Sequence, residues 1–349
     1  MRSTVSFVVL AALVAGLFIA HGVAGGASVA EAAETILVES TNGGTGTPST
    51  AGTASSDTRG TGNTEEVVRQ AGIAATPEQR LAVADRWGLA RINVSPAWDT
   101  AGTFAPVLVA VLDTGIDPEA ACASRVRAAI DFSGEGSTVD EHGHGTHMMD
   151  TIAAIAPNAS FLNVKVADRR GRCETGTVAN AIRWAADRGA DVINVSLEVA
   201  ASPELEAAVR HAWSKGAIVV AAAGNNGSTE PAFPAAYEEA IAVAASNEQD
   251  GLAVLSNHGD WIDIAAPGFR IYAEALDGNY DVETGTSPAA AHVSGVAALL
   301  YGIAEDSNDN GMVNDEVREA LETSARPLDI AGTGSGLVDA CAAVQLLLA

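Results

Sequence analysis

Three residues with the chemistry of a hydrolase stand in one order along the chain: Asp113, His144 and Ser287. Each lies within two residues of a glycine. An acid, a base and a hydroxyl nucleophile are the groups that attack a carbonyl carbon through an activated serine. The order Asp, His, Ser is one of three orders that recur in such enzymes on unrelated folds. The pattern therefore predicts nucleophilic acyl transfer.

The three groups have distinct predicted roles. A serine hydroxyl is a weak nucleophile until a base takes its proton, and His144 is the expected base because an imidazole ordinarily titrates near neutrality. Asp113 is expected to hold the tautomer of that imidazole and to stabilise its charged form. Ser287 is expected to open a helix over residues 288–301, whose positive end favours developing negative charge. Pro288 lacks an N–H, which the first turn of a helix does not need.

From Trp87 onward, short apolar runs alternate with amphipathic stretches. Such runs predict strands covered on both faces, and their alternation with helices predicts an α/β fold with a doubly wound parallel sheet flanked by helices. The expected strands are 107–112, 127–132, 160–166, 191–195, 217–222 and 240–245, and the expected helices are 144–155, 177–188, 203–215, 288–301, 315–323 and 337–348. Ligands of such sheets bind beyond the carboxyl ends of the strands. Asp113 directly follows the first expected strand, so it lies where chemistry is expected.

From Trp87 to the C-terminus the chain resembles the subtilisin-like serine proteases, or subtilases. The resemblance rests on segments 111–117, 143–147, 222–227 and 285–293, supported in the expected order by 86–99, 256–259, 266–268 and 334–340. It implies a subtilisin-like fold and a serine endopeptidase that cleaves polypeptides through an acyl-enzyme intermediate. It also identifies Asp113, His144 and Ser287 as the catalytic triad.

The resemblance assigns further residues to the site. The side-chain amide of Asn225 and the backbone N–H of Ser287 are expected to stabilise the oxyanion. Substrate is expected to lie as an added strand between two edges, Ser196-Leu197-Glu198 on one side and the loop of Gly171 and Cys173 on the other. Gly224 would form the floor of the pocket for the side chain before the scissile bond.

Four departures from the family pattern stand out. Asp150 lies on the histidine helix where the family usually has Gly, and its carboxylate needs water or a partner. Glu198 replaces Gly at the substrate edge, where it either favours a basic side chain or narrows the pocket. Pro288 and Ala291 replace the usual Met and Pro, which the helix should tolerate. Residues 154–157 leave no room for the calcium-binding loop that the family often has after this helix.

Calcium elsewhere stays open. Asp306, Asn308, Asn310 and Gly311 begin like an EF-hand loop, but its twelfth position is Val317 instead of Glu. We interpret this stretch as a polar turn ahead of a helix. No other cofactor and no catalytic metal are expected.

Residues before the domain have a different composition. Residues 1–30 carry one basic residue, an apolar core and small residues suited to cleavage, which indicates a signal peptide and export. A retained membrane anchor is the alternative. Residues 31–64 include a Gly/Thr/Ser-rich linker, residues 65–86 form a short pre-domain segment with helical spacing, and residues 87–349 form the peptidase domain. No convincing inhibitory propeptide is present.

The charge excludes several partners. The chain holds 19 Lys and Arg against 44 Asp and Glu, for a net charge of −25. Such a surface repels nucleic acid and anionic membranes. We therefore expect the protein to bind neither nucleic acid nor, after signal cleavage, a membrane. The signal peptide predicts a secreted, extracellular protein, the resemblance implies polypeptide substrates, and we expect a monomer.

The three cysteines leave two alternatives. Export permits disulfides, and an odd count leaves at least one thiol outside an internal bridge. Cys122 and Cys173 are the preferred pair because both fall in expected loops near the site, while Cys341 would be free. Three unpaired thiols are the alternative, since sequence alone does not give the Cα separation that a bridge needs.

Two other functions compete with the endopeptidase. One is a subtilase-fold binding module with little or no activity, suggested by Asp150 and Glu198. The other is a zinc enzyme built from His142, His144, His147 and Asp150, which would leave Asp113, Asn225 and Ser287 unexplained. We expect His147, His258 and His292 to be structural.

Overall fold

The computed structural model describes residues 86–349. The predicted signal peptide (1–30), the linker (31–64) and all but the last residue of the pre-domain segment (65–86) lie outside the described residues. None of the helices between residues 86 and 349 is long and apolar enough to cross a membrane.

A seven-stranded sheet forms the centre of the described domain. Its strands lie in the order β2-β3-β1-β4-β5-β6-β7, and all six neighbouring pairs are parallel. The strands are β1 (Val107–Asp113), β2 (Val126–Asp131), β3 (Ala159–Lys165), β4 (Val192–Val195), β5 (Ile218–Ala222), β6 (Ala240–Ser246) and β7 (Ile264–Pro267). The predicted doubly wound α/β architecture is therefore confirmed.

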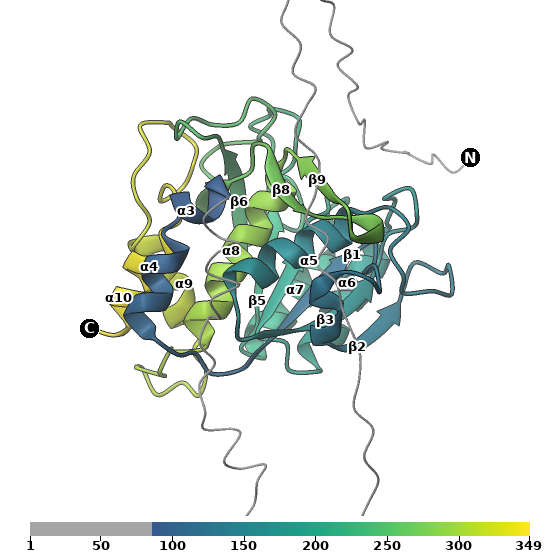
Figure 1. Cartoon of the computed structure of the whole chain (residues 1–349), viewed down its shortest axis with the longest axis horizontal. Coiled ribbons are helices and arrows are strands. Elements are labelled where there is room, and N and C mark those ends of the chain that lie inside the picture. Colours follow the sequence, from purple (N-terminus) through teal and green to yellow (C-terminus); the bar gives the residue numbers. More distant parts are fainter. Residues whose placement is uncertain (1–85) are drawn as a thin grey trace, which may run out of the picture. The chain divides into compact units, whose positions relative to one another are not determined.

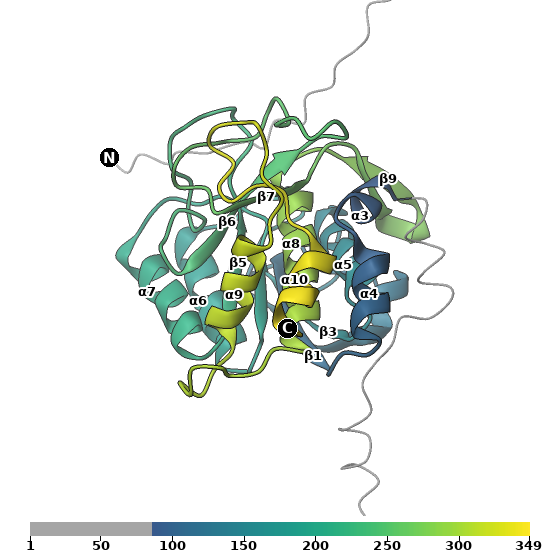
Figure 2. The same cartoon turned by 90° about the vertical axis from the view of Figure 1, so that its left-hand side faces the viewer.

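Helices cover both faces of this sheet (Figure 1). The α-helices are α3 (Trp87–Arg91), α4 (Val94–Ala101), α5 (His144–Ile155), α6 (Thr175–Ala186), α7 (Pro203–Ser214), α8 (Thr286–Tyr301), α9 (Asn314–Thr323) and α10 (Ala340–Leu347), and the short 3₁₀ helices are η1 (Ala121–Arg125) and η2 (Leu276–Gly278). Figure 2 shows α6 and α7 on one side, and α8, α10 and α4 on the other. Two separate buried clusters result, one for each face.

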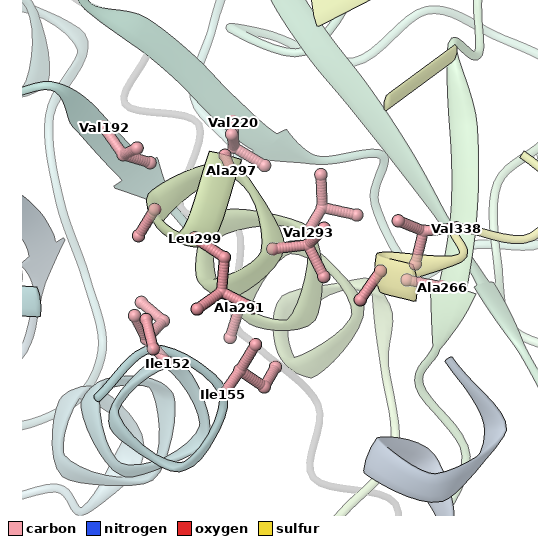
Figure 3. Close-up of a cluster of buried hydrophobic side chains, with 14 of the residues drawn as sticks. Ile152, Ile155, Val192, Val220, Ala266, Ala291, Val293, Ala297, Leu299 and Val338 are labelled. Atoms are coloured by element: carbon pink, nitrogen blue, oxygen red, sulfur yellow. The ribbon is translucent and has the colours of Figure 1, made fainter. Parts of the chain in front are cut away.

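Alternating residues of the strands feed the two clusters. Val109 and Val111 of β1 belong to the cluster of α5 and α8, whereas Ala110 and Leu112 belong to the cluster of α6 and α7. Successive side chains of a strand point to opposite faces, so a strand covered on both sides is apolar throughout. Figure 3 shows α8 packed between α5 and the sheet, with 15 of its 16 residues buried.

Several elements differ from the sequence prediction. Strand β7 and the antiparallel hairpin of β8 (Ile271–Glu274) and β9 (Tyr280–Glu283) were not predicted. Helix α8 begins at Thr286, so Ser287 is its second residue and does not precede it. Helix α10 begins at Ala340 because Leu337 is held by backbone bridges to Ala265 and Arg326.

The Arg125 guanidinium occupies the connection between helix α5 and strand β3. Only three residues separate Ile155 from Ala159. The Arg125 guanidinium donates hydrogen bonds to the carbonyls of Ala153 (3.1 Å), Ala156 and Ala159 (Nε, 2.8 Å). Burial lowers the pKa of Arg125 to about 10, which leaves it charged at neutral pH. Because the charged Arg125 guanidinium already binds these carbonyl oxygens, they are not available to a calcium ion. The connection is also too short for the calcium-binding loop that the family often has here.

The preferred disulfide was wrong, because Cys122, Cys173 and Cys341 are all free thiols. Cys122 is buried in the cluster of α5 and α8, while Cys173 packs against the cluster on the other face of the sheet. The sheet thus separates Cys122, in the 3₁₀ helix η1, from Cys173, in the loop before α6. Burial raises the pKa of each of these two thiols to about 12.

Candidate active site

Asp113 and His144 meet at the carboxyl edge of the sheet. Asp113 is the last residue of β1 and is 1% exposed, and His144 is the first residue of α5. Asp113 Oδ1 lies 2.7 Å from His144 Nδ1 and also accepts the Thr114 N–H at 2.7 Å. This contact holds Nδ1 as the protonated nitrogen and leaves Nε2 as the base.

Asp140, which the sequence analysis missed, ties the two elements together. Its carboxylate accepts hydrogen bonds from Thr114 Oγ1 (2.8 Å), from Thr146 Oγ1 (2.7 Å) and from the backbone N–H groups of His142, Gly143 and Thr146 (2.9 Å each). Thr114 Oγ1 in turn accepts the N–H of Gly145 at 2.9 Å. One buried carboxylate therefore fixes the start of the His144 helix to the residue after Asp113. An aspartate four residues before the histidine is the signal that could have revealed it.

Gly145 allows this close approach. A Cβ at that position would lie 2.3 Å from the Gly115 carbonyl oxygen and 3.2 Å from the Asp113 Cβ. Any larger residue would push α5 away from the end of β1. The glycine beside His144 thus serves the contact between base and acid.

Glu283, also missed, lies on the other side of the imidazole. Its carboxylate Oε2 is 3.9 Å from His144 Nε2, and the side chains of His144 and Glu283 are 17% and 28% exposed. Burial lowers the pKa of His144, but the negative charges of Asp113 and Glu283 outweigh it and raise the pKa to about 10. Asp113 and Glu283 together thus favour the imidazolium in this structure, and the role of His144 as the base stays a prediction.

Ser287 is held by Ser196. Its Oγ donates to the Ser196 carbonyl at 3.1 Å, and the Ser196 hydroxyl donates back to the Ser287 carbonyl at 3.1 Å. Ser196 directly follows β4, so this pair joins the start of α8 to the carboxyl edge of the sheet. The hydroxyl of Ser287 points to a backbone carbonyl and makes no hydrogen bond with His144.

The side chain of Asn225 is oriented by Thr286. Its Oδ1 accepts from the Thr286 N–H at 2.8 Å and from Thr286 Oγ1 at 3.1 Å. Because the oxygen is engaged, the amide nitrogen is the group that remains to donate. Asn225 therefore lies against the start of α8 with its amide nitrogen left to donate, and its part in an oxyanion hole stays a prediction.

Glu198 and Gly224 lie against each other at the predicted substrate edge. A Cβ on Gly224 would be 2.9 Å from Glu198 Oε2 and 2.5 Å from Asn257 Nδ2, and Gly224 has φ +95°. Both the space and the backbone conformation call for glycine. Burial raises the pKa of Glu198. Leu197 packs, partly buried, against the cluster of α6 and α7.

The opposite predicted edge lies beside the histidines. A Cβ on Gly171, which has φ +69°, would be 3.3 Å from His142 Nε2, and the His142 ring stacks edge-on 6.2 Å from that of His144. Cys173 feels the charge of Asp113, which, after burial, contributes to its raised pKa. The structure thus brings both predicted edges to the same end of the sheet as the triad residues.

Asp150 has the partner that the sequence left undefined. Its carboxylate forms an ion pair with Arg86 at 2.9 Å and accepts the Glu274 N–H at 3.0 Å.

His147 Nε2 bonds the Ile271 carbonyl at 3.0 Å. Within residues 86–349 no group of three or more His, Cys, Asp or Glu side chains is placed to hold a metal, so the zinc interpretation is wrong. His292 Nδ1 bonds the Pro288 carbonyl at 2.7 Å, as a structural histidine would.

Comparison with known proteins agrees with this geometry. A model of the subtilase family matches residues 105–339. The chain is 38% identical over 275 residues to a thermophilic serine proteinase of Bacillus sp. (strain AK1), spanning 74% of this chain and 66% of that relative. It is 38% identical over 288 residues to thermitase of Thermoactinomyces vulgaris, spanning 77% and 99%. A solved protease structure from Pseudoalteromonas arctica PAMC 21717 superposes with a TM-score of 0.66 at 29% identity and covers 73% and 94% of the two chains. The chain belongs to the subtilase family and is a serine-type endopeptidase.

Proposed function

We propose that this protein hydrolyses peptide bonds through Asp113, His144 and Ser287. The observation that carries the proposal is the 2.7 Å contact between Asp113 and His144 at the carboxyl edge of the sheet. Ser287 lies at the start of α8, and Asn225, in the loop after β5, is bonded to the neighbouring Thr286. These are the positions that a nucleophile and an oxyanion donor need.

The reaction follows from these positions. Rotation about χ1 of Ser287 takes its hydroxyl from the Ser196 carbonyl to His144 Nε2, and catalytic hydrogen bonds of free enzymes commonly tighten in this way when substrate binds. His144 accepts the hydroxyl proton as Oγ attacks the scissile carbonyl, and then donates it to the leaving amine. The Asn225 amide and the Ser287 N–H, which lies in a first helical turn and needs no helical acceptor, stabilise the oxyanion. Water then hydrolyses the acyl-enzyme by the same steps.

Glu198 gives the site its proposed selectivity. Its carboxylate lies at the floor formed by Gly224, where the side chain before the scissile bond would enter. The exposed Glu198 carboxylate there favours a basic side chain, because a substrate cation that enters the pocket would pair with it as both groups lose solvent. Profiling a peptide library with wild type and with Glu198→Gly tests this. An unchanged preference in the variant would contradict it. So would a variant that gains larger side chains of every kind while the wild type shows no preference for basic ones, since Glu198 would then only narrow the pocket.

A fluorophosphonate probe tests the catalytic assignment. Labelling of the wild type but not of Ser287→Ala is expected, with chelator leaving the labelling intact. A folded protein that takes up no label would favour the binding module instead. Asn225→Ala, which keeps the nucleophile, should label more slowly.

We infer that the protein is exported and acts outside the cell on polypeptides, as a monomer. Residues 1–30 carry the pattern of a signal peptide. Expression of the full chain with Ser287→Ala should give secreted protein whose N-terminal sequence starts after the small residues near position 30. Retention in the membrane fraction would support the anchor instead.

A further inference from the structure

The loop between α8 and α9 holds a motif that the proposed function does not use. Asp306 accepts the N–H groups of Asn310 (3.1 Å) and Gly311 (2.7 Å), and Asn308 Oδ1 accepts the N–H of Asn310 at 3.0 Å. These bonds close residues 306–311 into a compact turn, which lies at the lower left of Figure 2. It is the stretch that begins like an EF-hand loop.

Two neighbouring carboxylates of helix α9 point into this turn. Glu316 Oε1 accepts the N–H and the hydroxyl of Ser307, both at 2.9 Å. Asp315 Oδ2 accepts from Nδ2 of Asn308 (2.7 Å) and of Asn310 (2.9 Å). Glu316 is 8% exposed, so its charge lies almost fully away from water.

Each of the two carboxylates keeps one buried oxygen without a partner. These are Asp315 Oδ1 and Glu316 Oε2. Asp315 and Glu316 also lie within side-chain hydrogen-bonding distance of each other, so the two carboxyl groups must share either a proton or a cation. Buried acceptors without a donor cost free energy, and two adjacent carboxylates repel. A cation between them would satisfy both oxygens and cancel the repulsion.

We propose that this turn binds a calcium ion through Asp315 Oδ1 and Glu316 Oε2. Calcium takes six to eight oxygen ligands and accepts amide oxygens, backbone carbonyls and water beside carboxylates. The side-chain amides of Asn308 and Asn310 already donate to Asp315, so backbone carbonyls of the turn and water would complete the shell of the ion. Mg²⁺ fits less well, because it requires near-octahedral geometry and retains its water.

The ligand set predicts a weak site. No third acidic side chain joins Asp315 and Glu316, consistent with the lack of any larger metal-holding group between residues 86 and 349. Two carboxylates with neutral oxygens correspond to a Kd of about 10⁻⁴–10⁻³ M, the range of extracellular calcium modules. Such a site would be filled outside the cell and would pin the end of α8 to the start of α9.

The rival explanation is purely structural. Asp315 and Glu316 lie in the first turn of α9, where negative charge interacts favourably with the helix dipole. Both explanations predict that the carboxylates stabilise the helix. Only the calcium site predicts that their effect depends on the metal.

Calcium titration of variants separates the two. The full chain carrying Ser287→Ala, which prevents self-digestion, is stripped with chelator and titrated with CaCl₂ by calorimetry, with thermal melts in parallel. Calcium should raise the Tm of this parent. Asp315→Asn and Glu316→Gln should each weaken calcium binding at least about tenfold. Glu319→Gln, an exposed position on the same helix, should bind as the parent does.

A second signature concerns the metal-free protein. Without calcium, Glu316→Gln should be at least as stable as the parent, because the amide removes the repulsion with Asp315 and offers it a donor. Equal calcium stabilisation of the parent and of both variants would overturn the proposal. So would the absence of calcium binding by the parent, or a loss of Tm in Glu316→Gln that is the same with and without calcium.

Discussion

Replacing Glu283 by Gln should make the enzyme active at lower pH. The Glu283 carboxylate lies 3.9 Å from His144 Nε2 and stabilises the protonated imidazole. Only neutral His144 accepts the proton of Ser287, so activity rises with pH until the pKa of His144, about 10, is passed. Removing the negative charge lowers this pKa. The rising limb of kcat/KM should therefore move to lower pH.

The size of the shift follows from the distance. Two unit charges at this separation interact by about 1 kcal/mol in water and by about 4 kcal/mol at an effective dielectric constant of 20. Both side chains are partly exposed, at 17% and 28%, so solvent screening favours the lower part of that range. One pKa unit corresponds to 1.36 kcal/mol. We expect a downward shift of about one unit and, below the pKa, about tenfold higher kcat/KM in Glu283→Gln at the same pH.

The assay is the pH profile of kcat/KM, which reports ionisations of the free enzyme. Asp281→Asn is the matched control, because it removes a negative charge from the same strand two residues away. It should leave the limb in place. Raising the salt to about 1 M should reduce the difference between wild type and Glu283→Gln, since the Debye length falls to about 3 Å. An unmoved limb, or one displaced to higher pH, would refute the electrostatic reasoning.

Three further substitutions test other contacts. Arg125→Met should lower the free energy of unfolding in urea by about 3 kcal/mol, because charge-assisted hydrogen bonds to the carbonyls at the end of α5 are lost; exposed Arg127→Met should change it little. Asp150→Asn should cost about 3 kcal/mol in the same assay, because it leaves the largely buried Arg86 without its ion-pair partner; an unchanged midpoint would show that the pair contributes nothing. Asn225→Ala should lower kcat by about 10²–10³, a range carried over from subtilisin, with little change in KM.

Much of the architecture is visible in the sequence because strands buried on both faces leave continuous apolar runs. The segments that form β1 and β5 are runs of this kind. The segment that forms α5 was predicted separately, as a helix. Strand β7 was missed because it has four residues, Ile264–Pro267, and ends in proline. The β8–β9 hairpin was missed because Tyr272 and Val282 face solvent. Neither segment has a period that local pattern could detect.

Some residues of the site could be predicted from local sequence motifs, and others could not. Asp113, His144, Ser287 and Asn225 each stand in a short glycine-containing motif, so sequence alone singles them out. Glu283 acts through space on His144 from a distant segment, where a carboxylate has no local signature for such a role, whereas Asp140 lies only four residues before His144 and was within reach of a local pattern. The same limit explains the disulfide, because the sheet that separates Cys122 from Cys173 is a tertiary feature.

The hydrogen bond between Ser287 and the Ser196 carbonyl has a consequence for substrate discrimination. In the proposed binding mode, a peptide that adds a strand at this edge would offer its own N–H to that same carbonyl. Binding of the substrate backbone would then displace the Ser287 hydroxyl from the carbonyl and let it turn toward His144. The nucleophile would thus be activated only when a main-chain N–H binds. A small ester carries no such N–H. Methylating that peptide nitrogen should therefore depress kcat as well as raise KM, whereas an effect on KM alone would mean that the two events are independent.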